Sequence, residues 1–67
     1  MIVQINGAQR EFPEGITVEE LLQQLGLQGR LVVVELNKEI LVREAYSIQV
    51  LASGDQLELV HFVGGGR

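Results

Sequence analysis

Residues 17–26 read Thr-Val-Glu-Glu-Leu-Leu-Gln-Gln-Leu-Gly, and this stretch predicts an amphipathic helix. Its apolar side chains fall at positions i, i+3, i+4 and i+7, which place them on one stripe; they are Val18, Leu21, Leu22 and Leu25. Thr17 and Glu20 have the spacing of a capping box, in which each side chain satisfies a backbone N–H of the other residue. Gly26 can adopt the left-handed backbone conformation that commonly ends a helix. Because an apolar stripe has to be covered, we expect the helix to lie on a sheet.

The residues before the helix predict a β-hairpin. Residues 1–6 alternate in the period of a half-buried strand, with Met1, Val3 and Ile5 on one face. Asn6-Gly7 is a strong two-residue turn signal, since both residues tolerate positive φ. Residues 8–12 then form the return strand, and Pro13 ends it because proline has no N–H to donate.

The residues after the helix predict three more strands. Residues 31–36 are apolar almost throughout and β-branched in the middle, which makes them the best candidate for a central strand. Asn37-Lys38 is a turn into a short strand over residues 40–42, and Ser53-Gly54-Asp55 is a turn into a last strand over residues 56–63. Residues 43–53 are mixed, and we assign no element to them.

The predicted order is therefore β, β, α, β, β, β. One helix across one face of a mixed sheet of four to five strands is an α+β architecture, the outline of a ubiquitin-like β-grasp domain. We expect residues 1–63 to form this domain and residues 64–67 to be a flexible glycine tail.

Composition narrows the class of function. The 67 residues make one domain at most, and a net charge of −4 argues against a nucleic-acid binder and favours a protein partner. Apolar runs stay far below the roughly 20 residues that cross a bilayer, so no membrane role is expected. Cysteine is absent, and the first residues do not resemble a secretory signal. We expect a cytoplasmic protein without disulfides or a thiolate metal site.

The feature that suggests chemistry is Gly64-Gly65-Gly66, directly after the last strand. Glycine loses the most backbone entropy on ordering and brings no side chain to pack, so this segment adds nothing to the fold. Fully extended, three residues span about 10 Å, enough to carry a chain end into a narrow active site of another protein. A frayed end is the plain alternative, but here the segment is anchored on a strand.

The sequence resembles the ThiS family of sulfur carriers over nearly its whole length. The most specific parts are the ending Val-His-Phe-Val-Gly-Gly-Gly at residues 60–66 and the stretch Val-Glu-Leu-Asn-Lys-Glu-Ile at residues 34–40. Arg43-Glu44 and Tyr46 follow at the family's spacing, and Asn6-Gly7 and the leucine-rich helix also fit.

The resemblance implies a reaction cycle at Gly66. A ThiF-like adenylating enzyme would use ATP to adenylate the Gly66 carboxyl group, and a cysteine desulfurase relay would supply sulfur to make a thiocarboxylate. A ThiG-like thiazole synthase would then accept the sulfur for the thiazole of thiamine. Gly64, Gly65 and Gly66 would enter the active sites of these partners. The domain would be a carrier and co-substrate rather than an enzyme, with no stably bound cofactor and no metal.

Arg67 departs from the family pattern, in which the chain ends at the last glycine. While Arg67 is attached, the Gly66 carbonyl is an amide and cannot be adenylated. The carrier role therefore requires Arg67 to be a residue left by cloning or an extension that a peptidase removes.

Two other functions remain open. A MoaD-like small subunit of molybdopterin synthase shares the fold and the glycine tail, although the short length and the Val-His-Phe-Val sequence favour ThiS. A ubiquitin-like protein modifier or a plain β-grasp interaction module is the alternative of a different class. The products separate them: a thiocarboxylate for thiazole, one for dithiolene, or an isopeptide conjugate.

Few other residues suggest chemistry. His61 is the single histidine, and without a cysteine or second histidine we expect a structural or interface role. Val60 and Phe62 share one face of the last strand, and if exposed they would suit docking to an activating enzyme; a covering segment is the alternative. Arg43 and Glu44 are candidates for a partner interface, against the plainer interpretation of solvated charges. The serines have no base nearby in sequence, so an independent enzyme is not expected.

Overall fold

The structure, a computed structural model, describes residues 1–62. Its α-helix, α1 (Val18–Gln24), begins at the predicted capping box: the Glu20 N–H donates to the Thr17 hydroxyl, and the Thr17 N–H donates to the Glu20 carboxylate. The apolar stripe faces inward, because Val18, Leu21 and Leu22 are buried. Gly26 follows the helix with a positive φ of 75°. The helix prediction is therefore confirmed, including both of its ends.

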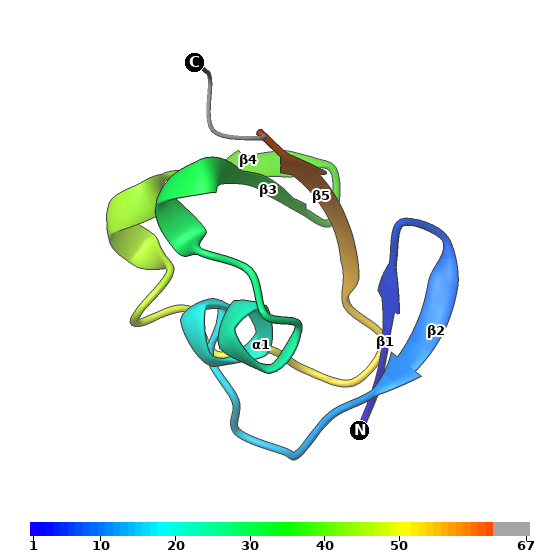
Figure 1. Ribbon diagram of the computed structural model, residues 1–67. Helices are drawn as coiled ribbons and strands as arrows, with labels where there is room; N and C mark the ends of the chain where they lie inside the picture. The colour runs from blue at the N-terminus through cyan, green and yellow to red at the C-terminus, as the bar shows by residue number, and fades with distance from the viewer. Residues whose placement is uncertain (63–67) are drawn as a thin grey trace.

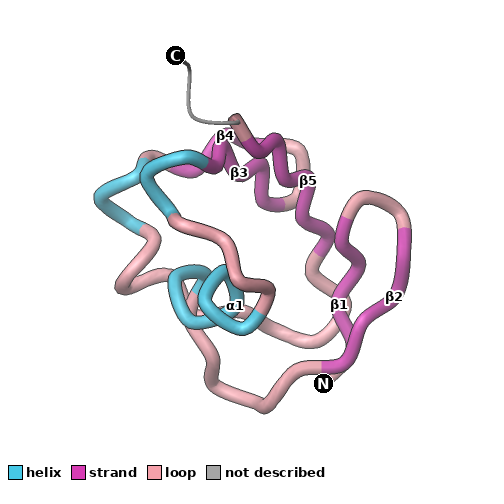
Figure 2. Tube along the Cα trace, viewed as in Figure 1, coloured by secondary structure: helices cyan, strands magenta, loops and turns pink. Residues whose placement is uncertain are grey.

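The helix lies on one face of a five-stranded mixed sheet (Figures 1 and 2). The strands are β1 (Ile2–Ile5), β2 (Ala8–Glu11), β3 (Val32–Leu36), β4 (Glu39–Leu41) and β5 (Gln56–His61), and two 3₁₀ turns, η1 (Gly29–Leu31) and η2 (Arg43–Ala45), precede β3 and follow β4. The strand order across the sheet is β2-β1-β5-β3-β4. β5 runs parallel to β1 and antiparallel to β3, so the two hairpins are joined through the last strand.

The middle position of the sheet belongs to β5, which corrects the expectation that residues 31–36 form the central strand. β3 is an interior strand, with Val32 and Val34 buried. However, the outer face of the sheet carries no helix within residues 1–62, so its middle strand does not need apolar residues on both faces. β5 therefore alternates polar Gln56 and Glu58 with inward-facing Leu57 and Leu59.

Two asparagines at the hairpin turns bind the backbone of β5. Asn6 (φ 51°) accepts from the Leu59 N–H at 2.8 Å and donates to the Leu59 carbonyl at 3.3 Å. Asn37 (φ 52°) accepts from the Gln56 N–H at 3.0 Å and donates to the Asp55 carboxylate at 3.1 Å. Each asparagine lies just after the end of its own strand, where the chain turns. Its side chain therefore adds hydrogen bonds to β5 beyond those of the β1–β5 and β3–β5 ladders.

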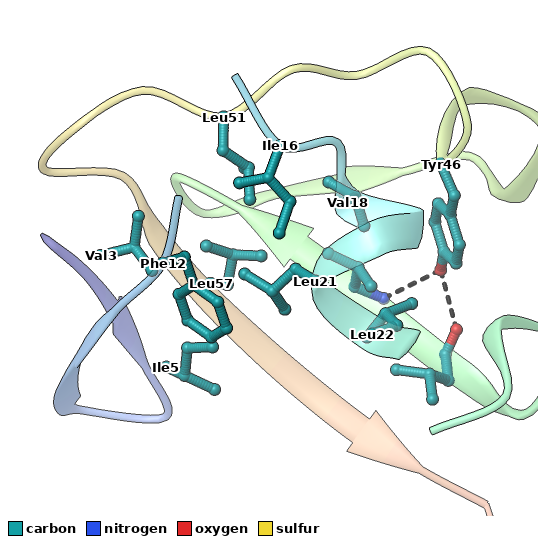
Figure 3. Packing of buried hydrophobic residues seen from close by; sticks show 12 residues of the cluster. Val3, Ile5, Phe12, Ile16, Val18, Leu21, Leu22, Tyr46, Leu51 and Leu57 are labelled. Carbon is teal, nitrogen blue, oxygen red and sulfur yellow. Dashed lines mark hydrogen bonds between the residues drawn. The ribbon is translucent and has the colours of Figure 1, made fainter. Parts of the chain in front are cut away.

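The core lies between α1 and the inner face of the sheet (Figure 3). Two of its residues, Tyr46 and Leu51, come from the stretch that the sequence left unassigned. The Tyr46 hydroxyl donates to the Val32 carbonyl at 2.8 Å and accepts from the Val34 N–H at 3.2 Å. A buried tyrosine thus satisfies two backbone groups of β3 in the interior of the protein.

These elements confirm the predicted ubiquitin-like β-grasp fold, a mixed sheet with one α-helix on one face. Within residues 1–62, every helix is too short or too polar to cross a membrane.

We predict that Asn6→Gly lowers the free energy of unfolding by about 1–2 kcal/mol, because the change removes both hydrogen bonds to Leu59. Glycine adopts positive φ without strain, so the turn itself is kept. Urea denaturation measures the difference. Lys38→Gly is the matched control: Lys38 also has a positive φ, of 71°, and its side chain forms none of the hydrogen bonds found in residues 1–62. Equal losses in the two variants would show that the amide does not hold β5.

Candidate functional site

The last described residues of β5 are held firmly to β3. Val32 and His61 are direct partners in the antiparallel ladder, and the Phe62 N–H donates to the Leu31 carbonyl at 2.7 Å. β5 ends beside the start of β3, and because β5 is parallel to β1, its end points in the same direction as the β1–β2 turn (Figure 1). The described part of the chain therefore ends at a fixed place beside β3.

The predicted reactive segment follows within a few residues. Gly64, Gly65 and Gly66 lie outside the described residues, so their role stays a prediction. Covalent geometry nevertheless limits their reach, because Gly66 is four positions after Phe62 in the sequence and four residue steps span at most about 14 Å. An enzyme that acts on Gly66 must therefore lie close to the end of β5.

The side chains on the two faces of β5 differ in how far they are exposed to solvent. Leu57 faces the core and is only 1% exposed, whereas Val60 and Phe62 face outward and are 53% and 54% exposed. The alternative in which a neighbouring segment covers Val60 and Phe62 is therefore wrong within residues 1–62. Their part in a partner interface stays a prediction.

Neighbouring strands extend this exposed surface into an apolar patch. Val33 is the direct partner of Val60 in the β3–β5 ladder. On the other side of β3, Ile40 and Val42 are 70% and 62% exposed. We define the apolar patch as Val33, Ile40, Val42, Val60 and Phe62.

The opposite end of the same face is polar. Gln4 is the partner of Gln9 on β2 and of Gln56 on β5, so three glutamines share one row. The outer face thus changes from glutamine-rich beside the β1–β2 hairpin to apolar around Val60 and Phe62.

Arg43 has a role that the sequence does not reveal. Its guanidinium donates to the Gly29 carbonyl at 3.2 Å and to the Val32 carbonyl at 3.3 Å. Together with the Tyr46 hydroxyl, which also donates to Val32 (Figure 3), Arg43 fixes the start of β3 opposite the end of β5. The spacing of Arg43 and Tyr46 is visible in the sequence, but it indicates no contact with β3. A partner contact of Arg43 stays a prediction.

His61 is exposed and its backbone pairs with Val32. Within residues 1–62, no group of three or more histidine, cysteine, aspartate or glutamate side chains is arranged to hold a metal ion. The described site therefore consists of a strand end and an apolar patch, and the candidate reactive group belongs to the tail.

A β-grasp domain whose last strand is followed by three glycines has the architecture of the ubiquitin-like proteins. The profile of the ThiS family matches residues 3–66, which includes the three glycines. The chain belongs to the ThiS family.

Known relatives agree with this assignment. The chain is 39% identical to the sulfur carrier protein ThiS of Bacillus subtilis over 97% of this chain and 100% of that protein. A crystal structure of the thiamine biosynthesis protein ThiS from Geobacter metallireducens superimposes with a TM-score of 0.83, at 39% identity, over 98% of this chain and 100% of that one.

A second kind of relative is much longer. The chain is 47% identical to a thiazole synthase of Paramagnetospirillum magneticum over 92% of this chain, but the match spans only 19% of that protein. A thiazole synthase of Magnetococcus marinus matches all of this chain at 42% identity and 21% of its own length. The chain therefore spans about a fifth of each of these thiazole synthases.

We predict that Phe62→Ser changes the free energy of unfolding by no more than about 0.5 kcal/mol, because the side chain is half exposed on an uncovered face. Leu57→Ala, on the buried face of the same strand, should cost about 2–5 kcal/mol. Urea denaturation of both variants makes the comparison. A large loss from Phe62→Ser would mean that the patch is part of the core.

Proposed function

We propose that this chain carries sulfur for thiazole formation in thiamine biosynthesis, as a thiocarboxylate on Gly66. The observation that carries the proposal is the extent of the family match, which runs through Gly64, Gly65 and Gly66 rather than stopping at the folded domain. The relatives named as sulfur carriers are matched over their whole length, which supports the same role here.

The chemistry explains why activation is needed. A free α-carboxyl group has a pKa near 3.5, so it is ionised at neutral pH and is a poor electrophile. A ThiF-like adenylating enzyme uses ATP to join AMP to the Gly66 carboxylate, which gives the carbonyl a good leaving group. The outer sulfur of the persulfide carried by a cysteine desulfurase relay then displaces AMP and forms an acyl disulfide. A second thiol, such as that of free cysteine, reduces this disulfide by thiol–disulfide exchange. The product is a thiocarboxylate, which a ThiG-like thiazole synthase consumes.

The amino-acid composition supports the Gly66 thiocarboxylate as the group that carries the sulfur. The sequence has no cysteine, so the chain has no thiol that could carry sulfur as a persulfide. The terminal acyl group of a glycine tail has no side chain near it and fits a narrow active site. The domain acts as a co-substrate in the cytoplasm, and its partners supply the catalytic groups.

We predict that a chain ending at Gly66 exchanges one oxygen for sulfur when it is incubated with the adenylating enzyme, ATP, a cysteine desulfurase and cysteine. Intact-mass spectrometry detects the exchange. The 67-residue chain should not be loaded while Arg67 is attached, because Gly66 then has no free carboxylate. Absence of sulfur on the chain ending at Gly66 would refute the proposal.

A second prediction separates the tail from the fold. Deleting Gly65 and Gly66 from the chain ending at Gly66 should abolish sulfur loading and leave the melting temperature nearly unchanged, since glycine has no side chain to bury. Thermal unfolding followed by circular dichroism provides the second measurement. A clear fall in melting temperature would show that these glycines belong to the folded domain.

A further inference from the structure

The apolar patch is an exposed surface that includes Val60 and Phe62, at the end of the described chain. α1 covers the inner face of the sheet, and within residues 1–62 the patch has no covering element. Contiguous exposed apolar surface next to a functional segment commonly marks a protein interaction site. The remaining question is which surface it fits.

Two carboxylates lie beside the apolar patch and make this part of the surface negatively charged. Glu35 and Glu58 are direct partners in the β3–β5 ladder, so their side chains leave the same face with Cβ atoms about 5 Å apart. Like charges directly opposite each other destabilise a sheet. The carboxylates that form hydrogen bonds within residues 1–62 are those of Glu20 and Asp55, and Glu35 and Glu58 are not among them.

The pair has apolar neighbours on two sides. Ile40 is the ladder partner of Glu35 on β4, and Val33 and Val60 form the next row toward the end of β5. A basic side chain placed between the two carboxylates would convert their repulsion into attraction. Complementary charge of this kind fixes the orientation and the choice of partner more than it adds raw affinity.

The same charges disfavour two other kinds of occupant of the apolar patch. A second copy of the chain related by a two-fold axis would bring four carboxylates of the same surface together. The net charge of −4 disfavours nucleic acid and anionic lipid as well. The surface that fits is apolar, with a lysine or arginine at the side that faces Glu35 and Glu58.

We propose that the apolar patch docks on the thiazole synthase, and that a basic side chain of that enzyme lies between Glu35 and Glu58. This inference rests on the proposed function, because an enzyme that takes up Gly66 must approach within about 14 Å of Phe62. Thiazole synthase is the partner to which the relatives point, since two of them are thiazole synthases that contain a matching domain. A shared chain keeps the two parts at high effective concentration.

The test uses Glu58→Lys in the 67-residue chain. The change places an ammonium group opposite Glu35, and an opposite-charge cross-strand pair should keep or raise the stability of the fold. The same change should weaken binding to the thiazole synthase about tenfold or more, because it puts a cation where the enzyme's own basic side chain has to lie. Isothermal titration calorimetry measures the Kd, and urea denaturation measures the stability.

Glu11→Lys is the matched control. Glu11 is exposed on β2, opposite Ile2, at the polar end of the sheet, and the variant has the same change in net charge. Its Kd should stay within about twofold of the unchanged chain at 0.15 M salt, where distant charges are screened. Equal weakening by both variants, or unchanged binding of Glu58→Lys, would overturn the inference.

A loading assay keeps this inference separate from the proposed function. Glu58→Lys in the chain ending at Gly66 should still be converted to the thiocarboxylate by the adenylating enzyme and its sulfur source. If loading is lost while thiazole synthase still binds, the patch serves the adenylating enzyme and the inference is wrong. Failure of the unchanged chain to load would instead refute the proposed function.

Discussion

The placement of β5 between β1 and β3 is the constraint on which the other features depend. Within residues 1–62, the last strand joins two hairpins that do not pair with each other, through a parallel ladder on one side and an antiparallel ladder on the other. Without β5 neither hairpin would have a sheet large enough to cover α1. The asparagines at the two turns extend this contact, because Asn6 and Asn37 each bind β5 backbone beyond the paired residues. Because the glycines follow β5 closely in the sequence, the position of this strand also determines where they are attached to the fold.

Most of the fold could be predicted because the local signals are strong and agree with one another. The capping box at Thr17, the helical stripe and the Asn6-Gly7 turn each depend on contacts within a few residues. The position of β5 could not be predicted in this way. Strand order is a property of long-range pairing, and the apolar run of residues 31–36 indicated burial without indicating which strand lies in the middle.

The residues of the candidate site could be recognised in the sequence, whereas their surroundings could not. The glycines and the alternation of Val60 and Phe62 can be read along the chain, but whether that face is covered depends on elements far away in sequence. Arg43 and Tyr46 illustrate the same limit, because their partners, Gly29, Val32 and Val34, lie more than ten residues earlier. Ile40 and Val42 join Val60 on one surface through strand register alone.

The hydrogen-bond ladders of β5 also have a mechanical consequence. A partner that draws the chain end into its pocket pulls along the axis of β5, and the interstrand hydrogen bonds lie across that axis on both sides. The load is therefore shared in shear by many bonds at once instead of opening them one by one, as it would at a sheet edge. With this arrangement, a partner can pull on the C-terminal end of a small domain without unfolding it.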